Sequence, residues 1–181
     1  MIKAHVILDN SIWKRKIKNP KKYFSEKLKK INLQVLKLVK QQRWYVFKTK
    51  GLKKNKITFN ILLTDSLNMK RLNKRFRGKC KSTDVLSFPD YMPNSKFSTN
   101  LYERIDLLTE KSEGIFLGEI AIDYEIINSR SKGNNFLLEF DKAWIHGLLH
   151  LLGFDHKKNK DYIKMLKEER QIYKSVISKT K

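Results

Sequence analysis

Three of the four histidines of this chain lie within eleven residues, from His146 to His156. His146 and His150 are four positions apart, a spacing that places both side chains on one face of an α-helix. Gly153 follows and can adopt the left-handed conformation that commonly ends a helix, so that the chain turns back and brings His156 towards the same point. The spacing therefore predicts three imidazoles that converge on one metal ion.

Three protein ligands leave one coordination position open, as in catalytic zinc sites, whereas structural zinc sites are closed by four ligands. We therefore predict one Zn²⁺ held by His146, His150 and His156, with a water in the fourth position. An isolated histidine on an apolar helix is more often a hydrogen-bonded core residue, but a third histidine after a helix-ending glycine favours the metal. Because water at such a site loses a proton near neutral pH, the motif predicts a hydrolase.

The spacing matches the metalloprotease template H-E-x-x-H-x-x-G-x-x-H, in which the glutamate is the general base. Gly147 occupies the position of that glutamate. Because glycine cannot transfer a proton, the sequence keeps the predicted metal ligands but argues against a zinc metalloprotease. The general base stays unassigned.

The basic residues are concentrated in one part of the chain. Net charge is +22, and residues 1–60 contain 18 basic and 2 acidic residues, whereas residues 101–181 contain 14 and 13. Such a charge favours binding to nucleic acid or to another anionic surface. Part of it is background, since 32 of the 40 basic residues are lysine and the frequent Asn and Ile indicate a codon bias.

Arginine gives a sharper signal for phosphate binding. Arg71, Arg75 and Arg77 lie within seven positions, and the guanidinium group suits forked contacts with phosphate. Arg77 precedes Gly78 at the expected end of a helix, where it could project into a cleft and neutralise charge that develops on a phosphodiester. We predict a catalytic role for Arg77 and RNA contacts for Arg71, Arg75 and Lys79.

The hydrophobic patterns predict four strands and five helices. The predicted strands are Ile2–Leu8, Ile57–Leu63, Thr83–Phe88 and Leu117–Asp123. The predicted helices begin at Asn19-Pro20, after Thr64-Asp65-Ser66, at Tyr124, at Phe136 (ending at Gly153) and at Asn159. Because strands and helices do not alternate strictly, we predict one α+β domain over residues 1–181, with a mixed sheet of about four strands packed against four to five helices.

Two segments lack a regular period. Residues 41–56 are predicted to be an irregular connection and residues 90–115 a long surface loop, with a helical turn near Leu101–Leu108. No apolar run approaches the about 18 residues of a membrane span. The lone Cys80 fits a reducing compartment. We expect a soluble, cytoplasmic protein that does not bind membranes.

Three blocks together resemble the bacterial YbeY family: HGLLHLLGFDH (146–156), LNKRFRGK (72–79) and TDVLSFP (83–89). The resemblance covers roughly residues 57–175. It implies an α+β fold and a single-strand-specific, metal-dependent endoribonuclease, usually assigned zinc. The implied role is late-stage 16S rRNA 3′-end maturation and ribosome quality control, with ribosomal RNA, the small ribosomal subunit and ribosome-associated proteins as partners.

By position, the resemblance implies that His146, His150 and His156 are the metal ligands and that Arg77 is the functionally important arginine. Glu119 stands where the family commonly has aspartate. Asp155 could orient a ligand imidazole or assist proton transfer, or it could cap the turn before the last helix. The sequence leaves two other functions open. One is an RNA-binding ribosome assembly factor without catalysis, in which the histidines bind a metal that only stabilises the fold, and the other is a zinc metalloprotease.

Overall fold

The computed structural model describes residues 1–42, 56–90, 114–132 and 135–178. Its elements are β1 (Ile2–Leu8), a 3-10 helix η1 (Ser11–Arg15), α1 (Pro20–Lys40), β2 (Ile57–Thr64), α3 (Ser66–Arg77), β3 (Val85–Pro89), β4 (Ile115–Asp123), α5 (Tyr124–Ser131), α6 (Phe136–Leu151) and α7 (Asn159–Ile177). The predicted α+β class, the four strands and the five α-helices are confirmed over this part of the chain.

The four strands form one mixed sheet in the order β1-β2-β4-β3. β1, β2 and β4 run parallel, and β3 pairs antiparallel with β4. This order could not be read from the sequence. It places β1 and β3 at opposite edges of the sheet.

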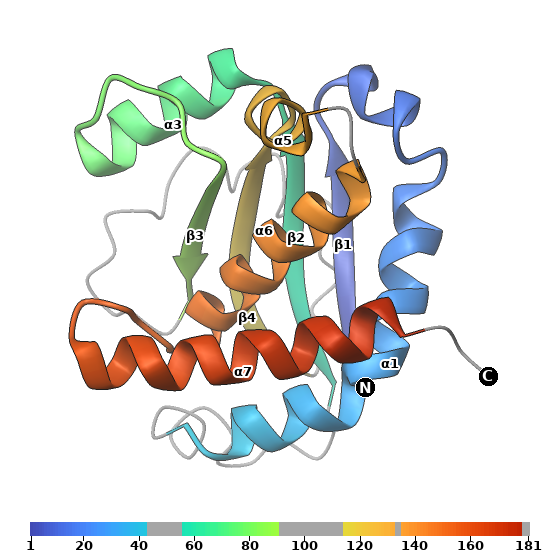
Figure 1. Ribbon diagram of the computed structural model, residues 1–181, viewed down its shortest axis with the longest axis vertical. Coiled ribbons are helices and arrows are strands. Elements are labelled where there is room, and N and C mark those ends of the chain that lie inside the picture. Colours follow the sequence, from blue (N-terminus) through green and yellow to red (C-terminus); the bar gives the residue numbers. More distant parts are fainter. Residues whose placement is uncertain (43–55, 91–113, 133–134, 179–181) are drawn as a thin grey trace.

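Two hydrophobic clusters join the helices to the sheet, and Figure 1 shows α6 and α7 crossing in front of the strands. Helices α1, α5, α6 and α7 contribute to the larger hydrophobic core, whereas α3 packs on a smaller cluster formed by Met69, Leu72, Leu86, Phe88 and Ala121. The histidine helix α6 and the lysine-rich helix α1 therefore share one core, and α3 with its arginines belongs to the other.

The helix ends follow the predicted capping signals. The Asn19 side chain accepts a hydrogen bond from the Lys22 N–H at the start of α1, where Pro20 is the first helical residue. Asp65, among the three candidates, caps α3 by accepting from the Asn68 N–H. Gly78 ends α3 with a φ of 67°, a conformation that glycine adopts without steric cost.

A buried polar network fixes α6 against α1. The carboxylate of Asp141, 1% exposed, accepts hydrogen bonds from Tyr23 Oη (2.6 Å), Lys27 Nζ (2.9 Å) and Trp144 Nε1 (2.7 Å). Burial and the adjacent Asp141 charge raise the pKa of Tyr23, which therefore stays a neutral donor. Trp13, completely buried, packs beside this network against Phe140. These contacts join α6 to α1 and to η1.

Some predicted boundaries differ from the structure. β3 begins at Val85 and includes Pro89, which an edge strand tolerates because proline lacks only an N–H donor. Helix α6 ends at Leu151, and Asn135 precedes it without a side-chain cap. The predicted helical turn at Leu101–Leu108 lies outside the described residues, as does most of the two irregular segments. None of the described helices is long and apolar enough to cross a membrane.

Candidate metal centre

The structure brings the three histidines of the motif together. One ligand nitrogen of each of His146, His150 and His156 lies within 4.8 Å of the other two. The Nε2 atoms of His146 and His150 are 3.1 Å apart, and the ring of His156 lies 5.0 Å from the ring of His150 between centroids. The predicted convergence is confirmed, and the three nitrogens could hold one metal ion.

A turn at the end of α6 produces this convergence. The Phe154 N–H donates to the Leu149 carbonyl (3.0 Å) and the Gly153 N–H donates to the His150 carbonyl (3.0 Å), the hydrogen-bond pair of a Schellman motif. Gly153 has the required left-handed conformation, with a φ of 93°. Phe154, 7% exposed, is buried, and this anchors the reversed chain before His156.

The ring of His150 is oriented by the same turn. Its Nδ1 lies 3.0 Å from the Phe154 carbonyl oxygen, which can only accept, so Nδ1 carries the proton and Nε2 carries the lone pair. Burial lowers the pKa of His150 to about 4, with the neighbouring His146 and His156 acting in the same direction. His150 is therefore neutral at physiological pH, the state in which imidazole binds a metal.

Three imidazole nitrogens suit zinc, copper, iron or nickel, and the His146–His150 pair is compatible with zinc geometry. Tetrahedral zinc with Zn–N bonds of about 2.0–2.1 Å holds its ligand nitrogens about 3.3 Å apart. The separation of 3.1 Å between the Nε2 atoms of His146 and His150 is close to that value. Only imidazole nitrogens form the group, and His156 is exposed, so the centre faces solvent on one side.

Helix α7 adds a carboxylate that the sequence reasoning missed. Glu169 Oε1 lies 3.6 Å from Nδ1 of His146, on the side of the ring opposite to His150. Metal-bound histidines commonly donate their second N–H to a carboxylate, which fixes the ring and its tautomer. No local pattern marks Glu169, because its role depends on how α7 packs against α6.

Gly147 has a steric reason to be glycine. A Cβ atom at this position would lie 2.8 Å from Ile120 Cγ2 and 3.2 Å from both Ser87 Oγ and Val85 Cγ2. The Ser87 hydroxyl donates to the Gly147 carbonyl at 3.2 Å. The position therefore faces the sheet rather than the histidines, and a glutamate there could not act on a substrate at the metal.

The Asp155 carboxylate contacts its own loop. Oδ1 accepts from the His156 N–H at 2.8 Å, and Oδ2 lies 3.2 Å from Lys157 Nζ. Partial burial acts to raise the pKa of Asp155, but this hydrogen bond and the Lys157 ammonium outweigh it, so the pKa is lowered. The carboxylate thus supports the backbone at His156, and a role in orienting an imidazole stays a prediction.

Arg77 is exposed at the end of α3, and no described contact joins it to the histidines. Its neighbour Phe76 packs edge-on against Phe88 of β3, with ring centroids 5.2 Å apart. β3 in turn contacts α6 through Ser87 and Gly147, the residue after His146. The end of α3 and the histidine turn therefore both border the β3 edge of the sheet.

The other predicted RNA-binding residues lie near Arg77. Arg71 donates to Asn68 Oδ1 at 3.0 Å, and the guanidinium of Arg75 lies 5.4 Å from the centre of the Phe76 ring. Arg71, Arg75 and Lys79 are all exposed. Glu119 is instead buried in β4, where it accepts from Asn60 Nδ2 at 2.9 Å.

Fold and site together define a class: an α+β protein with a partly exposed group of three histidines that could hold a metal ion, as in metal-dependent hydrolases. Residues 16–177 match the family model described as "Endoribonuclease YbeY", and the chain belongs to that family.

Curated proteins named Endoribonuclease YbeY include one from Pelagibacter ubique that is 40% identical over 183 residues, covering 99% of both chains. The protein of Thermodesulfovibrio yellowstonii is 33% identical, covering 81% of this chain and 89% of its own. That of Clostridium acetobutylicum is 36% identical, covering 71% and 80%. A solution structure from Thermotoga maritima aligns with 97% of this chain and 89% of its own, with 24% identity and a TM-score of 0.47.

Proposed function

We propose that this protein is a single-strand-specific, zinc-dependent endoribonuclease of the cytoplasm. Its expected role is late-stage 16S rRNA 3′-end maturation and ribosome quality control. The observation that carries the proposal is the group of three imidazole nitrogens within 4.8 Å, exposed on one side, in a chain whose relatives are named endoribonucleases. The proposed partners are ribosomal RNA, the small ribosomal subunit and ribosome-associated proteins.

Each site residue has a distinct proposed role. His146, His150 and His156 would hold one zinc ion, with a water in the fourth position, and Glu169 would hold the His146 ring in place. When bound there, zinc supplies a Lewis acid for a phosphoryl oxygen and activates water for attack. Arg77 would neutralise the charge that develops on the phosphodiester, and the chain has no assigned general base.

The surrounding basic residues would position the substrate. Arg71 and Arg75 are exposed on α3, Arg77 is exposed at its last position, and Lys79 follows Gly78. Contacts from such side chains to phosphates fix register without reading sequence. Asp155 would keep the His156 backbone in place through its hydrogen bond to the N–H of that residue.

The test compares RNA cleavage and folding in the same preparations. Protein with stoichiometric metal should cut an unstructured RNA and leave a duplex of the same sequence intact. Chelation and His150→Ala should each abolish cleavage, while circular dichroism shows the native fold. If no metal restored cleavage and chelation unfolded the protein, the centre would be a structural staple and the chain an assembly factor without catalysis.

A further inference from the structure

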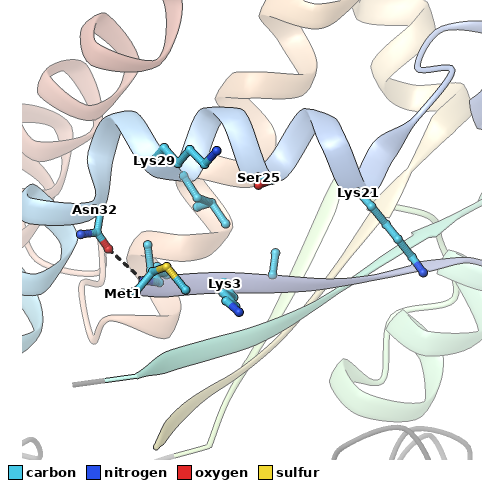
Figure 2. Close-up of a pocket in the computed structure, with 9 residues that line it drawn as sticks. Met1, Lys3, Lys21, Ser25, Lys29 and Asn32 are labelled. Carbon is cyan, nitrogen blue, oxygen red and sulfur yellow. Dashed lines mark hydrogen bonds between the residues drawn. The ribbon is translucent and has the colours of Figure 1, made fainter. Parts of the chain in front are cut away.

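A groove lies between β1 and the N-terminal half of α1, at the sheet edge opposite to β3 (Figure 2). Its volume is about 520 Å³. Ile2, Ala4 and Leu28 provide apolar lining, and Lys3, Lys21 and Lys29 add three exposed ammonium groups. Asn32 Oδ1 accepts from the Ile2 N–H at 2.9 Å and thereby ties the start of β1 to α1.

The lysines of α1 divide into two groups. Lys22 lies 3.9 Å from Glu26, Lys27 binds Asp141 at 2.9 Å, and Lys30 donates to the Val176 carbonyl at 3.5 Å. Lys21 and Lys29, which line the groove, have no partner among the described residues, and neither has Lys3 of β1. No carboxylate lines the groove. Lys37 and Lys40 of the same helix also have no side-chain partner among the described residues, but Lys37 lines a second groove that contains the carboxylate of Glu168. The absence of a carboxylate therefore distinguishes the groove of Lys3, Lys21 and Lys29.

The shape and chemistry of the groove define its ligand. In the described sheet, β1 pairs with β2 alone, and α1 runs along β1 with the Ile2 N–H bonded to Asn32, so the groove is an elongated channel between strand and helix. Unpartnered cations with no carboxylate among them attract phosphates. Ile2 and Leu28 are buried, at 4% and 2% exposure, so a ligand would be held mainly through its phosphates. Single-stranded RNA is the polyanion that the proposed function supplies.

We propose that this groove, named here the lysine groove, is a second contact surface for single-stranded RNA, separate from the metal centre. This proposal rests on the endoribonuclease function proposed above. Three strand spacings of about 4.8 Å separate β1 from β3, so the groove would hold a segment of RNA at a distance from the bond that is cut. It would raise the affinity for long substrates without taking part in the reaction.

The test measures binding of a labelled, unstructured RNA over a range of salt concentrations. The triple variant Lys3→Gln, Lys21→Gln, Lys29→Gln removes the groove charges. The matched control Lys160→Gln, Lys167→Gln, Lys174→Gln removes three exposed charges from α7. The groove variant should bind at least tenfold more weakly, and the slope of log K against log salt should fall by about 2, as three lost phosphate contacts require. The triple variant Lys3→Arg, Lys21→Arg, Lys29→Arg, which keeps the three positive charges, should bind RNA as wild type does.

Several results would overturn the proposal. These are equal losses in the two triple variants, unchanged affinity in the groove variant, or tighter binding of a polyglutamate peptide than of RNA to the groove.

Measuring RNA cleavage as well as binding distinguishes a failure of the groove proposal from a failure of the proposed endoribonuclease function. An RNA just long enough to reach the metal centre should be cut equally by wild type and the groove variant. His150→Ala should bind long RNA as wild type does and cut none of it. If His150→Ala still cut RNA, the endoribonuclease assignment at this centre would fail, while the binding comparison would still decide the groove.

Discussion

The metal centre and the lysine groove lie on helices that share one hydrophobic core, yet their polar groups are held in opposite ways. At the metal centre, His150 is fixed by the Phe154 carbonyl, and His146 lies 3.6 Å from Glu169. In the groove, Lys3, Lys21 and Lys29 have no partner among the described residues. The first arrangement suits an ion that demands fixed geometry, and the second suits a flexible polyanion. Metal affinity at the centre should therefore depend on the position of individual atoms. RNA affinity in the groove should depend on the total number of positive charges.

The largest effect should come from Gly147→Glu. A Cβ atom added at this position would lie 2.8 Å from Ile120 Cγ2, and the glutamate carboxylate would be forced against the sheet. We expect a loss in the free energy of unfolding at or above the upper end of the about 1–3 kcal/mol typical of overpacking. Urea denaturation measures it. Ser25→Glu in the exposed groove should change stability by no more than about 0.5 kcal/mol. Equal losses in the free energy of unfolding for Gly147→Glu and Ser25→Glu would contradict this difference between the metal centre and the groove.

Glu169→Gln should weaken metal binding by about 10–100-fold, because we propose that its carboxylate, 3.6 Å from His146 Nδ1, holds that ring in place for the metal. Competition with a chromophoric chelator measures the affinity. Glu168→Gln is the matched control, since the neighbouring side chain has no described contact with the histidines. A Glu169→Asp variant that recovers part of the affinity would support positioning, whereas equal affinities for Glu168→Gln and Glu169→Gln would exclude it.

A single groove substitution should have a smaller, salt-dependent effect. Lys29→Gln should lower the slope of log K against log salt for single-stranded RNA by about 0.7, with no change in bound metal. Fluorescence titration and metal analysis of the same sample test both parts. A change in metal content would show that groove and centre are coupled and would remove the distinction between them.

A last prediction concerns the pH dependence of the metal-free protein. The pKa of His150 is lowered from 6.5 to about 4 by burial and by the other two histidines. Between these values the unfolded chain binds a proton that the native state does not, so stability should fall as pH decreases from about 6.5 to about 4. Thermal denaturation in chelator measures this. His150→Gln should flatten the dependence, and an unchanged dependence would show that His150 is not its source.

The features that the sequence predicted are local ones. The i, i+4 pair His146 and His150, the helix-ending Gly153 and the capped start of α3 depend on residues close together in the chain. Membership in the YbeY family also followed from short blocks, and the full-length match confirms it.

The missed features depend on packing between distant segments. Tyr23 and Asp141 are 118 positions apart, and Glu169 reaches His146 only because α7 lies along α6. The division of the α1 lysines into partnered and unpartnered groups needs the position of every neighbouring carboxylate. Sheet order was equally unreadable, because the strand pattern is compatible with several orders.

The most direct test of the central claim is a paired measurement of single-turnover RNA cleavage and bound metal for wild type, Arg77→Ala and His150→Ala. Arg77→Ala should keep its metal and native fold and cleave about 10²–10³-fold more slowly, because one stabiliser of the transition-state charge is lost. His150→Ala should lose both metal and cleavage and still fold. Wild-type cleavage by His150→Ala, or by metal-loaded Arg77→Ala, would contradict the account.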